Sequence, residues 1–150
     1  MNKFYQLLRI NHYIKNLLVF APLLFTTSIS DTDNIFKSLQ AFVVFCLLAS
    51  TVYIFNDILD LPSDKKHPQK KKYKPLASGS LSVNKAKLIF LLIISCLSFI
   101  IFFNKELLNI CLFYLLIYFF YTIYLKEIAF IDIFILSSNY ILRAYMGCVA

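Results

Sequence analysis

Glycine is almost absent from this chain of 150 residues, which contains two glycines and no tryptophan. A phosphate-binding loop built from glycine-rich backbone needs several glycines close together, so that class of nucleotide site is excluded. Charged residues are also scarce, at 15% of the chain, whereas 60% of the residues are hydrophobic. This balance excludes a disordered chain or an ordinary soluble domain, and it indicates an all-α integral membrane protein.

Cysteine pairs with the spacing of a metal site or a redox motif are missing as well. The four cysteines lie inside apolar runs and show no CxxC spacing: Cys46, Cys96, Cys111 and Cys148. We therefore expect small buried hydrophobic residues at these positions, and neither disulfides nor metal ligands.

Apolar runs predict five membrane-spanning helices and one long loop. The spans cover about 13–30, 35–60, 86–103, 107–125 and 128–149, and the loop covers 61–85. Pro22 predicts a kink in the first span, and Ser82 predicts a helix N-cap before the third. A cleaved signal peptide ending near Ser30 is an alternative for the first run, but its basic N-terminal region is long for one.

The formal net charge of +7 would be compatible with nucleic-acid binding, but the basic residues lie between apolar runs. Cytoplasmic turns of membrane proteins are enriched in Lys and Arg. With the N-terminus in the cytoplasm, twelve basic residues fall on that side, and Lys37 and Lys105 fall on the other. We therefore expect no nucleic-acid partner, and a protein of the cytoplasmic membrane whose 61–85 loop faces the cytoplasm.

Carboxylates and lysines are concentrated in the stretch 53–79. Asp57 and Asp60 are three residues apart and share one helical face, whereas Pro62 separates them from Asp64. Six lysines follow in the loop: Lys65, Lys66, Lys70, Lys71, Lys72 and Lys74. Mg²⁺ is commonly held by one or two carboxylates together with substrate phosphates, which lysines also attract. The pattern predicts a site for a metal-bound polyphosphate, with a solvated basic loop beside helix-capping aspartates as the alternative.

Polar residues also occur in and beside the last two spans. Asp132, Asn139 and Arg143 are seven and four residues apart, so they fall on one helical stripe. We expect this stripe to line a polar cavity, because charge at membrane depth is costly, with a purely structural helix association as the alternative. Tyr124 and Lys126 end the fourth span, where spacing alone indicates an aromatic belt with a flanking lysine.

Several of these motifs resemble the UbiA superfamily of intramembrane transferases. The segment 56–64, Asn-Asp-x-x-Asp-x-x-x-Asp, resembles its first aspartate-rich motif. Arg9, Lys15, Asn16 and the stretch 67–79 resemble the branch of decaprenyl-phosphate phosphoribosyltransferases. Departures from that branch occur at Ile10, His12, Tyr13 and Lys74.

The resemblance implies a fold and a set of site residues. The fold is the N-terminal half of a nine-helix bundle, because the family's second aspartate-rich motif is missing here. We expect a truncated or partial sequence, or a half that pairs with a second chain. The resemblance implies Mg²⁺ at Asp57, Asp60 and Asp64, and catalysis by Asp57, Asp60 and Lys15. It implies substrate binding by Arg9, Asn16, Asn56, Lys70, Lys74, Tyr124, Lys126 and Arg143.

The implied reaction is Mg²⁺-dependent transfer of 5-phosphoribose from phosphoribosyl pyrophosphate to a polyprenyl phosphate in the membrane lipid. An alternative with the same fold transfers a polyprenyl group from its diphosphate to an aromatic acceptor. Arg9, the Lys15-Asn16 pair and the stretch 67–79 favour the first reaction. A membrane scaffold or transporter fragment without chemistry is an alternative of another class, but it leaves the carboxylates beside the lysine loop unexplained.

Overall fold

The computed structural model describes residues 3–126 and 128–150, without the side chains of residues 27, 28, 129 and 132. Every regular element in this part of the chain is helical, as predicted. The N-terminal elements are α1 (Lys3–Leu8), the 3₁₀ helix η1 (Ile10–Phe20), α2 (Ala21–Phe25) and η2 (Thr27–Ser30). The remainder are α3 (Thr32–Leu59), α4 (Leu61–Lys66), α5 (Pro68–Tyr73), α6 (Val83–Phe103), α7 (Lys105–Phe120), the π-helical turn η3 (Tyr121–Leu125) and α8 (Ala129–Val149).

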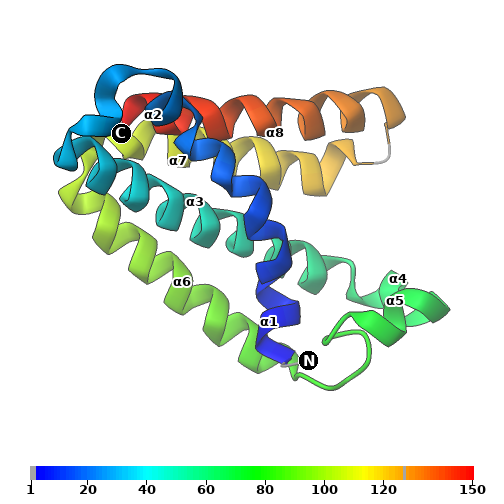
Figure 1. Cartoon of the computed structure of the whole chain (residues 1–150). Helices are drawn as coiled ribbons and strands as arrows, with labels where there is room; N and C mark the ends of the chain where they lie inside the picture. The colour runs from blue at the N-terminus through cyan, green and yellow to red at the C-terminus, as the bar shows by residue number, and fades with distance from the viewer. Residues whose placement is uncertain (1–2, 127) are drawn as a thin grey trace.

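The central helix is α3, which packs against η1, α6, α7 and α8. Figure 1 shows α4 and α5 projecting from one end of this bundle, where α3 ends. Asp31 is the N-cap of α3, and its side chain accepts a hydrogen bond from the Asp33 amide. The helix therefore begins at Thr32, three residues before the expected span. Its buried residues fall on all sides, as expected for a helix surrounded by other helices.

Within the part of the chain that the structure describes, three helices are long and apolar enough to cross a membrane: α3, α6, and α7 continued by η3. The apolar part of α8, Ile133–Val149, is shorter than these three. The expected first span is not one α-helix, because η1 is a 3₁₀ helix and α2 begins at its end with Pro22 in the first turn. Ser82 caps α6 as predicted, by accepting a hydrogen bond from the Lys85 amide. Five spans therefore remain a prediction.

Two apolar clusters hold the helices together. The larger one joins α3, α7 and α8, with Val19 of η1 buried among them. The smaller one joins Leu7 of α1 and Ile54 of α3 to Leu76 and Leu81, which precede α6, and to Ala86 in its first turn. Within a bilayer such side chains stabilise helix contacts by close packing, because lipid tails are as apolar as they are. The smaller cluster thus fixes α1 and the chain after α5 against the last turns of α3.

Helix α8 approaches η1 very closely at Gly147. A Cβ atom at this position would meet the Val19 carbonyl oxygen well inside van der Waals distance, and Pro22 Cδ at 3.2 Å. Only glycine allows two backbones to pack this closely, as at other helix contacts within membranes.

All four cysteines are free thiols. Cys46 and Cys111 are buried as expected, but the expectation is wrong for Cys96 and Cys148, which lie on outward faces of α6 and α8. An apolar run cannot distinguish the inward face of a membrane helix from the outward one, because both are apolar.

Candidate functional site

The three aspartates of the 56–64 segment are separated by a change of helix. Asp60 is at once the C-cap of α3 and the N-cap of α4. Pro62 lies in the first turn of α4, where its missing N–H is tolerated. The predicted interruption at this proline is therefore confirmed. As a result Asp57 lies in the last turns of α3, whereas Asp64 lies in α4.

Lys74 brings Asp57 and Asp64 together. Its Nζ lies 2.9 Å from Asp57 Oδ1 and 2.6 Å from Asp64 Oδ2. The side chains of Asp57 and Asp64 are only 2% and 1% exposed. One ammonium group therefore bridges two buried carboxylates. Without such a partner, burying these two negative charges would be very costly.

The shared contact keeps these groups charged. Burial alone would raise the pKa of Asp64, but the ammonium groups of Lys74 and Lys70 outweigh it and hold that pKa below its usual value. Burial likewise opposes the charge of Lys74, but its bonds to Asp64 and Asp57 raise its pKa above the usual value. Asp64 and Lys74 are therefore both ionised at neutral pH.

Arg9 approaches Asp57 from the N-terminal side. Its Nη2 lies 3.0 Å from Asp57 Oδ1, and its guanidinium lies 4.5 Å from the centre of the Tyr53 ring. The backbone of Arg9 is left-handed, with φ at 51°. This conformation is uncommon for a residue with a Cβ atom and is frequent at functional sites. It turns the chain between α1 and η1 so that the Arg9 side chain reaches the end of α3.

These groups line a cavity of about 410 Å³ between α1, the end of α3 and α5. Its charged side chains are Arg9, Asp57, Lys70 and Lys74, so its net charge is positive and suits an anion. Uncharged hydrogen-bonding groups complete the wall, among them Gln6, Asn11, His12 and Gln69. None of these four residues was predicted as a site residue. Their one sequence signal is proximity to Arg9 and Lys70.

The opposite face of the 56–64 segment contacts the end of α7. The Thr122 hydroxyl donates a hydrogen bond to Asn56 Oδ1, and the Lys126 ammonium pairs with Asp60. Asp60 therefore does not join Asp57 and Asp64 in this structure. Thr122 was missed, although Thr122 and Lys126 share the four-residue spacing of Asn56 and Asp60. Tyr124, which lies between Thr122 and Lys126 in the sequence, packs its ring against Phe120 and is mostly exposed.

A second polar group lies deeper in the bundle. Arg143 Nε donates a 2.8 Å hydrogen bond to Asn16 Oδ1, and both residues are buried, at 3% and 1% exposed. The Arg143 guanidinium also lies 5.4 Å from the Phe45 ring centre. Asn139 and Arg143 are buried in the protein interior, and the lining of a polar cavity by this stripe stays a prediction. The side chain of Asp132 lies outside the described residues.

Three predicted site residues, Lys15, Asn16 and Arg143, lie apart from both the cavity and the Asp60–Lys126 contact. Lys15 is exposed and lines a separate hollow with Ile14 and Tyr140. Arg143 belongs to the buried pair with Asn16. The structure thus gathers Arg9, Lys70 and Lys74 at the carboxylates, and it places Lys15 and the Asn16–Arg143 pair elsewhere.

The donor atoms around Lys74 fit a divalent cation in part. The described residues contain no group of three His, Cys, Asp or Glu residues that could hold a metal ion. Asp57 and Asp64 nevertheless converge on one point, and Asp64 Oδ1 is buried with an ion pair to Lys70 at 3.2 Å and no hydrogen bond. Two carboxylates and substrate phosphates are sufficient ligands for Mg²⁺. The pair therefore fits such an ion if Lys74 moves aside.

Comparison with known proteins adds the family. Residues 17–150 match the model of the UbiA prenyltransferase family. The chain is 37% identical to the decaprenyl-phosphate phosphoribosyltransferase of Mycolicibacterium smegmatis, over 95% of this chain and 46% of that protein. It is 34% identical to the enzyme of the same name from Corynebacterium glutamicum, over 95% of this chain and 44% of that protein. The chain thus spans less than half the length of these relatives.

The family match and the three apolar helices agree with the composition in indicating an integral membrane protein. The match covers most of the chain and includes the 56–64 segment, α7 and α8. On these grounds the chain belongs to the UbiA prenyltransferase family.

Proposed function

We propose that this chain supplies the donor half of a site that transfers 5-phosphoribose from phosphoribosyl pyrophosphate to a polyprenyl phosphate, such as decaprenyl phosphate. The observation that carries the proposal is the positively charged cavity lined by Asp57 and Lys74, at whose wall Lys74 also pairs with the buried Asp64. The names of the relatives supply the lipid and the phosphoribosyl group. A further segment or a second chain would complete the site, and the cavity would face the cytoplasm, where the basic residues are concentrated.

The carboxylates are proposed to hold Mg²⁺. Asp57 and Asp64 would be its ligands, and Asp60 would join them if Lys126 released it. Bound Mg²⁺ would neutralise charge on the pyrophosphate leaving group. Lys74 would then leave the carboxylates and bind phosphate oxygens, as Arg9 and Lys70 would from the cavity wall.

The reaction requires little acid–base chemistry from the protein. The bond between the anomeric carbon and a pyrophosphate oxygen breaks, and its electron pair leaves with the pyrophosphate. An oxygen of the polyprenyl phosphate supplies the electron pair of the new bond to that carbon. Because this acceptor is already anionic, no general base has to remove a proton. Arg9, Lys70 and Lys74 contribute by stabilising charge on the departing group.

The remaining predicted residues belong to the acceptor side of the proposal. Asn56 and Asp60 contact Thr122 and Lys126 on the face of the 56–64 segment that is opposite the cavity. Lys126 is the basic group through which a lipid phosphate would be bound there, and the exposed ring of Tyr124, two residues earlier, would contact the lipid. Roles for Lys15, Asn16 and Arg143 in the reaction stay predictions.

Prenyl transfer to an aromatic acceptor is the second candidate, because the same carboxylates would serve a prenyl diphosphate. The wall of the cavity favours a sugar phosphate instead. Gln6, Asn11 and Gln69 offer hydrogen bonds to ribose hydroxyls, whereas a prenyl chain would need an apolar continuation at this point.

Adjacent lysines of α5 provide a matched test. Lys70 forms an ion pair with Asp64 and lines the cavity, whereas Lys71 is exposed and does not line it. We expect Lys70→Gln to weaken Mg²⁺-dependent binding of phosphoribosyl pyrophosphate about tenfold, the loss typical of one charged hydrogen bond. Lys71→Gln should leave the affinity unchanged. Titration calorimetry on the purified chain measures both, and equal affinities for the two variants would refute the assignment of this cavity.

A further inference from the structure

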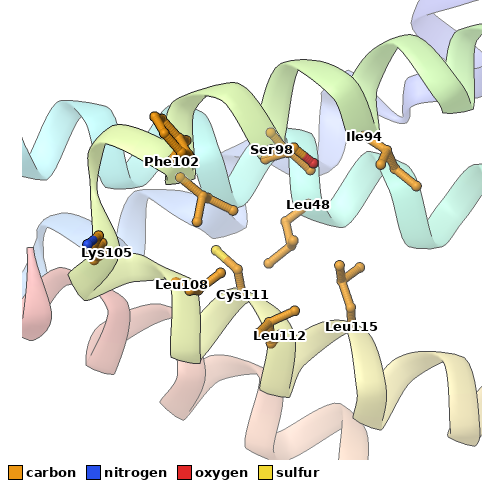
Figure 2. Close-up of a pocket in the computed structure, with 11 residues that line it drawn as sticks. Leu48, Ile94, Ser98, Phe102, Lys105, Leu108, Cys111, Leu112 and Leu115 are labelled. Carbon is orange, nitrogen blue, oxygen red and sulfur yellow. The ribbon is translucent and has the colours of Figure 1, made fainter.

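A second hollow lies far from the aspartates, between α6 and α7. It is a groove of about 340 Å³ whose floor is formed by Leu48 of α3 (Figure 2). The α6–α7 turn beside it contacts the beginning of α3 through a hydrogen bond from Asn104 to Gln40. Gln40 precedes Asp57 by 17 residues of α3, or roughly 25 Å along a helix. The groove therefore opens towards the opposite end of the bundle.

The groove is apolar along its length and has a single charge at its end. Figure 2 shows Leu108, Leu112 and Leu115 of α7 facing Ile94 and Phe102 of α6 across it. Lys105 is the charged residue of the lining, and no described residue forms an ion pair with it. Glu106 follows in the sequence but does not line the groove.

This combination matches an amphiphile with a long apolar chain and an anionic head. An apolar groove of this kind does not hold ordered water, because it lacks polar partners for it. Both helices have membrane-spanning length, and their rim residues, such as Phe102, are exposed apolar side chains of the kind that lipid contacts. The Lys105 ammonium, at the first residue of α7, adds its charge to the positive end of that helix dipole. An anionic head beside Lys105 therefore satisfies the one charge that the protein leaves unpaired there.

We propose that the α6–α7 groove binds an anionic phospholipid of the bilayer, with one acyl chain in the groove and the phosphate at Lys105. The site is separate from the carboxylate cavity and does not depend on the proposed transfer reaction. Lipids of this charge would stabilise the α6–α7 pair, whereas zwitterionic lipids would occupy the groove with less preference.

The absence of tryptophan from the sequence permits a specific test. Phe102 lines the groove and Phe103 does not, although the two are neighbours on α6 with similar exposure, at 76% and 72%. Phe102→Trp and Phe103→Trp therefore place one fluorophore inside or outside the groove at similar depth. Each variant is reconstituted in phosphatidylcholine vesicles with a minor fraction of brominated phosphatidylglycerol or brominated phosphatidylcholine.

We expect brominated phosphatidylglycerol to quench Phe102→Trp more strongly than brominated phosphatidylcholine does, and to show no such preference at Phe103→Trp. Adding Lys105→Gln to Phe102→Trp should reduce the preference about fivefold, the effect of one lysine on anionic lipid. Equal quenching of Phe102→Trp by both lipids would overturn the proposal. Weaker quenching than at Phe103→Trp by both lipids would overturn it too, because protein and not lipid would then cover the groove.

Discussion

Replacing Asp57 by Asn should abolish Mg²⁺-dependent pyrophosphate release by the protein. Asp57 is buried and contacts both Arg9 and Lys74, so it ties the proposed metal ligands to the phosphate-binding cations. The amide removes a metal ligand and leaves two cations with one carboxylate fewer. We expect a fall of about 100-fold or more, the scale of losing one preorganised charge-stabilising group. Release of pyrophosphate from phosphoribosyl pyrophosphate, with and without Mg²⁺, measures it.

Asp33→Asn is the matched control, because Asp33 is an exposed aspartate in the first turn of the same helix. This variant should release pyrophosphate at the unaltered rate. A thermal unfolding curve for Asp57→Asn shows whether the fold survives. Undiminished release by a folded Asp57→Asn protein would contradict both transfer reactions considered for this cavity.

The largest effect on stability is expected from Gly147→Ala. The added methyl group would clash with the Val19 backbone, which cannot move aside as the end of a flexible side chain would. Overpacking of this kind costs about 3 kcal/mol, which exceeds the gain of about 1 kcal/mol from replacing glycine by alanine within a helix. Unfolding of the purified protein in detergent micelles should show the corresponding loss in free energy of unfolding.

Cys148→Ala serves as the control for this substitution, since Cys148 is the next residue of α8 and is exposed. Its free energy of unfolding should match that of the unsubstituted protein. If Gly147→Ala were as stable as Cys148→Ala, α8 and η1 would not be packed as closely as described.

Local signals in the sequence located the ends of two helices correctly. Pro62 marks the change of helix between Asp57 and Asp64, and Ser82 marks the start of α6, because capping and proline geometry depend on a few neighbouring residues. The same holds for the interior position of Arg143, which follows from the cost of charge at membrane depth.

The arrangement of the site could not be derived in the same way. Lys74 reaches Asp57 and Asp64 because the expected loop 61–85 contains two short helices, α4 and α5, which fold the chain back onto the end of α3. The spacing in the sequence predicts one shared face for Asp57 and Asp60. In the structure Asp60 pairs with Lys126 instead, a contact that spans 66 residues and depends on how α7 packs. Tertiary contacts of this kind leave no periodic trace in the sequence.

The most direct test of the central claim is transfer of label from phosphoribosyl pyrophosphate, carrying ¹⁴C in its ribose, into the lipid of membranes that contain the protein. With decaprenyl phosphate and Mg²⁺ present, we predict label in the lipid fraction and an equal amount of released pyrophosphate. Without Mg²⁺ we predict neither labelled lipid nor released pyrophosphate. Absence of lipid label, together with consumption of a polyprenyl diphosphate in the presence of an aromatic acceptor, would contradict the account and assign the cavity to prenyl transfer.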